Sequence, residues 1–183
     1  MGCMTLRKIA RLGHPVLLGK AAPVEDVDDP GLQLLIDDML ETMADAEGIG
    51  LAAPQVYVAS RVILAQEMED RSEAASAPVR VLINPELEPL GEEVVLGHEG
   101  CLSIPGLRGL VPRWQRVGWR ALDRDGRRIE GEALGLFARV LQHEVDHLDG
   151  IVYPMRMPDL RHLAFTSEMH HLEDWLRAEG ATG

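Results

Sequence analysis

The stretch that decides the fold is Ala138-Arg139-Val140-Leu141-Gln142-His143-Glu144-Val145-Asp146-His147-Leu148. Its apolar residues predict a buried α-helix from about Leu134 to Leu148, which carries the pattern H-E-x-x-H. Residues four apart on a helix point the same way, so His143 and His147 can bind one metal ion. Glu144 projects roughly a quarter-turn away, beside an open position on that metal. The pattern is typical of a metal-assisted hydrolase.

The same pattern has simpler interpretations. It arises by chance in roughly one chain in forty of this composition, and two histidines can also lie on a solvated helix face. Three features favour a metal site. The flanking residues are strongly apolar, ionisable side chains are seldom buried without a partner, and Asp149-Gly150 ends the helix soon after His147.

A catalytic metal usually has three protein ligands, so a third ligand is expected. The chain has two cysteines, Cys3 and Cys101. Cys101 follows a strand-like run at 92–96 and precedes a turn rich in glycine and proline. A single cysteine is also a common small core residue, and His98 is a competing ligand. The residues alone leave these alternatives open.

The segment Glu47–Gln55 is rich in glycine and alanine. Such small residues let a backbone approach another group closely. A simpler interpretation is a helix end at Gly48 followed by a loop. The segment is not a phosphate loop, because no Lys-Ser/Thr pair follows the glycines. Gln55 places an amide donor at the end of this loop, where it can bind a substrate oxygen.

These three segments, in this order, resemble the peptide deformylase family. Gly48–Gln55 reads G-I-G-L-A-A-P-Q, Glu99–Ser103 reads E-G-C-L-S, and Gln142–His147 reads Q-H-E-V-D-H. Each motif is complete, and the resemblance runs from the first helix to about Met157. One departure is Tyr57, because the family commonly has glycine there.

The resemblance implies a role for each matching residue. The implied metal ligands are Cys101, His143 and His147. Glu144 is implied as the catalytic acid and base. The Gln55 side chain and the Leu102 N–H are implied as the catalytic groups that bind the oxyanion. The residues expected to contact substrate are Ile49, Gly50, Gly100, Arg108 and Val140.

The resemblance also implies the chemistry. The enzyme removes the formyl group from the N-terminal formylmethionine of newly made polypeptides and releases formate. One divalent metal is expected, Fe(II) in the cell, with zinc, nickel or cobalt as substitutes. A thiolate ligand suits Fe(II) as readily as Zn(II), so ligand type does not name the metal.

Two other functions compete with this one. A zinc endopeptidase also uses H-E-x-x-H, but it needs a distant Glu or His as third ligand and leaves the segment Glu99–Ser103 unexplained. A deformylase-like binding protein without catalysis is the second alternative. The complete set of Gln55, Cys101, Leu102 and Glu144 argues against it.

The composition limits the binding partners and the cellular location that can be expected for the protein. The net charge of −12 disfavours binding to nucleic acid or to an anionic membrane, and no direct sequence-specific contact with nucleic acid is expected. A transient contact with the ribosome is expected from the family, and basic residues that are mostly solvated are available for it (Arg7, Lys8, Arg11, Arg113, Arg116 and Arg120). No apolar run is long enough to span a membrane, and no signal peptide is recognised, so a cytoplasmic location is predicted.

The chain is predicted to be one compact α+β domain over residues 1–183. Antiparallel strands and hairpins are expected to pack around the central metal-binding helix. Asp29 and Pro30 begin a helix that ends near Gly48, and Asp123–Gly126 forms a hairpin turn between strands at 117–122 and 128–132. Strands are also expected at 62–65 and 79–83. Residues 66–78 are predicted to be a flexible insertion, and residues 158–183 a C-terminal helix and tail.

Overall fold

A computed structural model describes residues 5–70, 72 and 76–178. Its larger sheet has five antiparallel strands in the order β1-β2-β3-β6-β7. These strands are β1 (Gly50–Ala52), β2 (Val62–Gln66), β3 (Val79–Pro89), β6 (Arg116–Leu122) and β7 (Arg128–Leu134). A second antiparallel sheet has the order β4-β5-β8, made of β4 (Val94–Cys101), β5 (Ile104–Trp114) and β8 (Leu163–Phe165).

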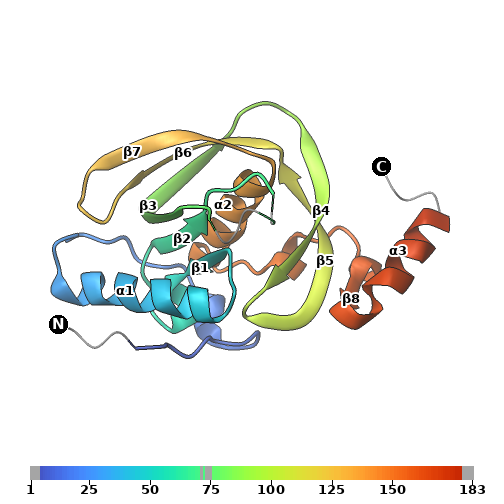
Figure 1. Cartoon of the computed structure of the whole chain (residues 1–183), viewed down its shortest axis with the longest axis horizontal. Helices are drawn as coiled ribbons and strands as arrows, with labels where there is room; N and C mark the ends of the chain where they lie inside the picture. The colour runs from blue at the N-terminus through green and yellow to red at the C-terminus, as the bar shows by residue number, and fades with distance from the viewer. Residues whose placement is uncertain (1–4, 71, 73–75, 179–183) are drawn as a thin grey trace.

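Helix α2 (Gly135–Leu148) lies at the centre, between the larger sheet and the β4–β5 hairpin (Figure 1). Its apolar face packs with residues of β2, β6 and β7 in one buried cluster, in which Ala138 and Leu141 are fully buried. Helix α1 (Pro30–Asp45) covers a second cluster with β1 and β2. The predicted α+β domain, with antiparallel strands around the H-E-x-x-H helix, is confirmed.

Local signals explain where the elements begin and end. The Asp29 carboxylate accepts a hydrogen bond from the Gly31 N–H at 2.9 Å, and Pro30 occupies the first turn of α1. After α1, the left-handed residue is Glu47, with φ 51°, and not Gly48. Gly48 still closes the helix end, because its N–H donates to the carbonyl of Met43 at 2.9 Å.

The predicted insertion at 66–78 falls partly on residues 71 and 73–75, which lie outside the described residues. Gln66 belongs to β2, and Met68 is buried. The Glu67 N–H donates to the Pro78 carbonyl at 2.9 Å, which joins the two ends of the segment. The two ends of the segment, near Glu67 and Pro78, are therefore part of the folded domain.

The C-terminal helix is α3 (Met169–Ala178), which extends away from the main body (Figure 1). The range 158–183, predicted as a C-terminal helix and tail, also contains the strand β8, and in α3 only Leu176 is buried. No helix within the described ranges is long and apolar enough to cross a membrane.

Candidate metal centre

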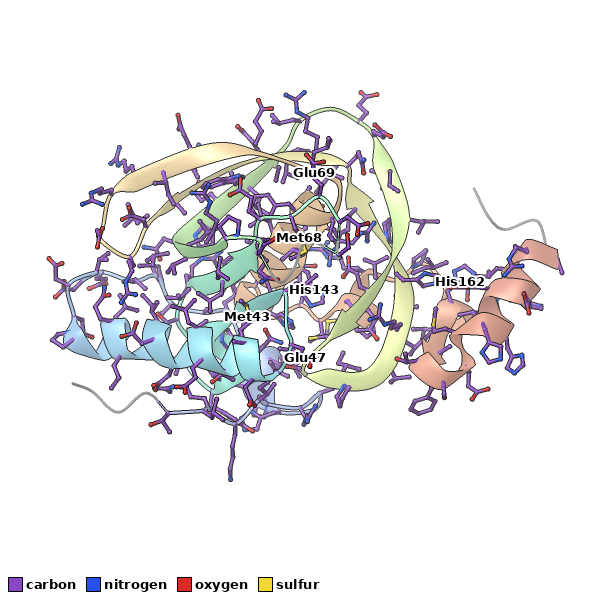
Figure 2. All side chains as sticks on the ribbon, in the orientation of Figure 1. Met43, Glu47, Met68, Glu69, His143 and His162 are labelled. Carbon is purple, nitrogen blue, oxygen red and sulfur yellow. The ribbon has the colours of Figure 1, made fainter. Side chains whose placement is uncertain are left out.

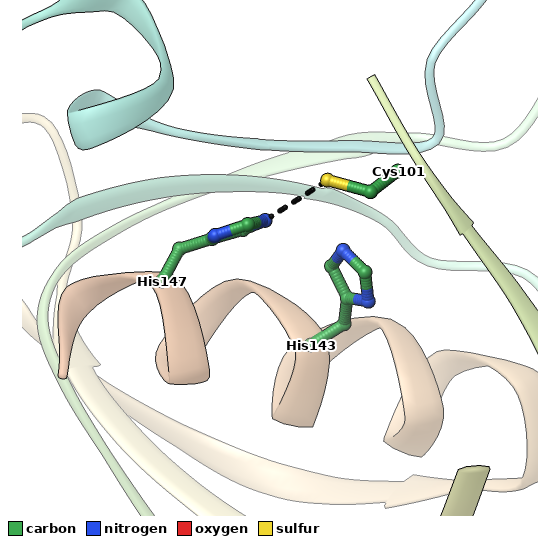
Figure 3. Close-up of side chains that lie close together, drawn as sticks. All are labelled: Cys101, His143 and His147. Atoms are coloured by element: carbon green, nitrogen blue, oxygen red, sulfur yellow. Dashed lines mark hydrogen bonds between the residues drawn. The ribbon is translucent and has the colours of Figure 1, made fainter. Parts of the chain in front are cut away.

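Cys101, His143 and His147 come together beside helix α2 (Figure 3). Helix α2 provides both histidines one turn apart, and Cys101 ends strand β4. Their candidate ligand atoms all lie within 4.8 Å of one another, and the Cys101 Sγ is 3.2 Å from the His147 Nε2. In the described part of the chain this is the one such group of His, Cys, Asp or Glu.

The spacing fits a metal ion. Tetrahedral zinc with ordinary sulfur and nitrogen bond lengths places those two ligand atoms roughly 3.5 Å apart. A thiol and an imidazole 3.2 Å apart need only a small adjustment to reach that separation. His98, the competing candidate, lies on β4 and lines the neighbouring cavity but does not belong to the ligand group.

The protonation of the two histidines follows from their surroundings. Burial and the adjacent His143 hold the pKa of His147 well below its usual value, so its ring is neutral as a metal ligand requires. Burial also acts on His143, but the Cys101 sulfur and the Glu99 carboxylate outweigh it and raise the pKa of His143. The Cys101 sulfur and the Glu99 carboxylate therefore stabilise the protonated form of the His143 ring.

Glu144 is buried beside the ligands and does not join them. Burial raises the pKa of this carboxyl to about 7, against the opposing effect of His143. Its Oε2 is buried with no hydrogen-bond partner in the protein. A Cβ on Gly50 would overlap the Glu144 carboxylate, so glycine is needed there for close approach. The Glu144 carboxylate therefore packs against Gly50 and keeps one oxygen available for a reacting group.

Gln55 lies in the short helix Ala53–Val56, where its side chain is fixed at both ends. Its Oε1 accepts from the Ala52 N–H at 2.8 Å, and its Nε2 donates to Ser103 Oγ at 3.2 Å and to Cys101 Sγ at 3.4 Å. The Gln55 amide nitrogen thus contacts one candidate metal ligand, Cys101, and the neighbouring Ser103 hydroxyl.

A cavity of about 510 Å³ opens beside the ligands. Its lining includes Glu47, after α1, and His143, on α2. Both residues are labelled in Figure 2. The cavity wall includes every sequence-predicted site residue except His147, which is fully buried behind it. Those lining residues are Ile49, Gly50, Gln55, Gly100, Cys101, Leu102, Arg108, Val140, His143 and Glu144.

The structure adds supporting residues that sequence reasoning missed. Glu99 Oε2 lies 2.8 Å from His143 Nδ1, and Arg113 forms two hydrogen bonds to the same carboxylate, at 2.8 and 3.0 Å. These bonds outweigh burial and lower the pKa of Glu99 to about 2. Arg113 also donates to Asp146 at 2.6 Å.

The expectation that Arg113 is solvated was therefore wrong. Its side chain is 5% exposed because two carboxylates compensate its charge in the interior. By contrast, Arg116 and Arg120 are exposed, as expected. Glu99 and Asp146 stand inside the quoted motifs, two residues before Cys101 and one before His147. These positions were the available signal that the two carboxylates support the ligands.

The fold and the site together define a metal-binding hydrolase of the H-E-x-x-H class, with a cysteine as third candidate ligand and a carboxylate beside it. The profile of the polypeptide deformylase family matches residues 6–162, and the chain belongs to this family. Its members remove the N-formyl group from nascent peptides, so the chain is a hydrolase of protein biosynthesis and acts through a metal.

Individual relatives agree. Peptide deformylase 1 of Bordetella pertussis is 52% identical over 163 residues, which cover 88% of this chain and 93% of that protein. A Met-Ala-Ser-bound crystal structure of a class I type b peptide deformylase from Acinetobacter baumannii has a TM-score of 0.78 at 38% identity, covering 85% of this chain and all of that one. The Thermus thermophilus peptide deformylase structure has a TM-score of 0.74 at 40% identity, with 95% of each chain covered.

Proposed function

We propose that Cys101, His143 and His147 hold one divalent metal ion, Fe(II) in the cell, and that Glu144 is the acid and base of deformylation. The observation that carries this proposal is the Glu144 Oε2 atom, which has no hydrogen-bond partner in the protein and is buried in the cavity next to the three candidate ligands. Nickel, cobalt or zinc can take the place of iron, since thiolate and imidazole suit all four.

The metal, when bound, supplies a Lewis acid that activates water and polarises the formyl group. Glu144 takes the proton from the attacking water and passes it to the leaving amine. The C–N bond of the formamide breaks, and formate and a free methionine amine are released. A carboxyl whose pKa is raised to about 7 is suited to accepting and returning a proton near neutral pH.

Charge that develops on the formyl oxygen is met by hydrogen-bond donors. We assign this role to the Gln55 amide, which already contacts the Cys101 sulfur, and to the Leu102 backbone N–H. The fixed Gln55 side chain needs little reorganisation to serve the transition state, because Ala52 and Ser103 hold it.

The cavity wall accounts for substrate binding in this proposal. Ile49, Val140 and the His143 ring form the walls for the methionine side chain. Gly50 and Gly100 let the peptide backbone approach, and Arg108 lies along its continuation. The substrates are N-formylmethionyl nascent peptides, met in the cytoplasm with a transient ribosome contact. The strongly acidic chain is not expected to bind nucleic acid by sequence.

Turnover of formyl-Met-Ala-Ser, with metal content measured on the same sample, tests this function. We expect formate release at about one metal per chain. An internal, unformylated peptide should not be cleaved; its cleavage would instead favour the endopeptidase alternative. Stoichiometric metal with no turnover of the formyl peptide would favour a binding protein without catalysis.

A further inference from the structure

The N-terminal segment Ala10–Leu12 contacts the backbone of both proposed oxyanion donors. The Ala10 N–H donates to the Gln55 carbonyl at 2.8 Å, and the Leu12 N–H donates to the Ser103 carbonyl at 2.9 Å. Between them, the Arg11 Nη1 donates to the Leu102 carbonyl at 2.9 Å. One short segment thus fixes two loops that are distant in sequence.

This segment is itself anchored. The Arg7 N–H donates to Thr42 Oγ1 at 2.9 Å, and its Nε donates to Asp38 at 3.0 Å, so α1 holds the chain just before Ala10. The Arg11 side chain therefore starts from a fixed backbone when it reaches the Leu102 carbonyl.

The peptide unit between Leu102 and Ser103 connects Arg11 to a metal ligand. Its carbonyl accepts from Arg11, and its N–H, that of Ser103, donates to the Cys101 Sγ at 3.4 Å. A cation at the carbonyl end polarises the peptide, which strengthens the donor at the other end. Hydrogen bonds to a ligating sulfur tune how strongly it donates charge to the metal.

We propose that Arg11 is a positioning residue of the active site. It holds the Leu102–Ser103 peptide so that the Ser103 N–H faces the Cys101 sulfur, and the adjoining Leu102 N–H keeps its direction. The effect on turnover rests on the proposed function, whereas the effect on Cys101 does not. Arg11 also lines the substrate cavity, so binding and catalysis must be separated in its test.

The test compares Arg11→Met with Lys8→Met, both loaded with Co(II). Lys8 is an exposed cation three residues before Arg11, so both variants lose one positive charge at the surface. Methionine retains an unbranched apolar stem at either position. The two measurements are the wavelength of the sulfur-to-cobalt charge-transfer band and the steady-state kinetics with formyl-Met-Ala-Ser.

In Arg11→Met the sulfur lone pairs lose part of their hydrogen bonding. We expect the band to move to longer wavelength and kcat to fall about tenfold, the lower end of the usual loss for outer-shell partners. KM should change little, because the contact matters for the transition state. Lys8→Met should keep the wild-type band and kcat.

An unshifted band in Arg11→Met would overturn the link to Cys101, as would an equal shift in Lys8→Met. A rise in KM with unchanged kcat would make Arg11 a substrate-binding residue and overturn the positioning role. If wild-type protein fails to deformylate but the band still shifts, the proposed function fails and the Arg11–Cys101 link stands.

Discussion

The Nδ1 atom of His143 lies 2.8 Å from the Oε2 atom of Glu99. Glu99 stands two residues before Cys101 on β4, so one strand provides both a candidate metal ligand and the partner of another. The carboxylate accepts the Nδ1–H, which fixes the ring and leaves Nε2 to face the metal. Arg113 and Arg139 complete the surroundings of Glu99 at 2.8–3.0 Å.

Glu99→Gln should weaken metal binding. The neutral amide gives His143 a poorer acceptor, and it leaves Arg113 and Arg139 without their shared negative partner. Loss of an outer-shell partner typically costs about 10–100-fold in metal affinity or activity. The free energy of unfolding should also fall, by about 3–5 kcal/mol, because a buried ion pair is broken. Competition with a chelator and denaturant unfolding measure the two effects.

Glu92→Gln is the matched control, since Glu92 is an exposed carboxylate just before β4. Wild-type metal affinity is expected in that variant. Should Glu99→Gln also bind metal as tightly as the wild type, the carboxylate does not support His143.

The sequence predicted much of this site because its motifs are local. The spacing of His143 and His147 on one helix follows from helix geometry alone, and Gly50 and Gln55 stand in one short segment. Arg113 could not be placed in the same way. Whether an arginine is solvated or buried depends on which carboxylates the fold brings to it, here Glu99 and Asp146 from two other elements.

In the fold, too, local features could be predicted from the sequence, and contacts between distant segments could not. The hairpin at Asp123–Gly126 was predicted from its turn residues, and its strands are β6 and β7. The pairing of β3 with β6 joins segments far apart in the chain, so no local pattern reveals it. The short strand β8 was missed for a similar reason, because its pairing with β5 defines it.

Gly50→Ala should reduce turnover without unfolding the protein. The new methyl group would overlap the Glu144 carboxylate, and that side chain must move to make room. We expect kcat to fall by about 100-fold, the typical cost of losing acid–base catalysis, while metal content stays near one per chain. Gly19→Ala is the control, because a Cβ there has ample space. Near-normal kcat in Gly50→Ala would contradict the proposed position of Glu144 in the reaction.

Iron-loaded protein should lose activity in air faster than nickel-loaded protein. Both Fe(II) and the Cys101 sulfur can be oxidised, whereas nickel substitution removes the metal-centred route. Activity followed over time in aerobic and anaerobic buffer, for both metal forms, measures this difference. Equal rates of loss in air would mean that oxidation at the metal is not the cause.

Glu144→Ala separates metal binding from catalysis most directly. The carboxylate lies outside the ligand group, so Cys101, His143 and His147 remain and the variant should fold and bind metal. Acid–base catalysis is typically worth about 10²–10⁴-fold, and kcat should fall at least that far. KM should change less, because the carboxylate acts mainly in the transition state.

His143→Ala and His147→Ala provide the contrast, since each should lose metal and activity together. Metal content and kcat should be measured on the same preparations. A misfolded Glu144→Ala protein would lose both metal and activity, so retained metal shows that its loss of activity is not caused by misfolding. A Glu144→Ala protein with full metal and near-normal turnover would remove Glu144 from the mechanism. The proton would then have to reach the leaving amine by another route, and the raised pKa of this carboxyl would reflect its burial and the nearby Glu99 charge without a catalytic role.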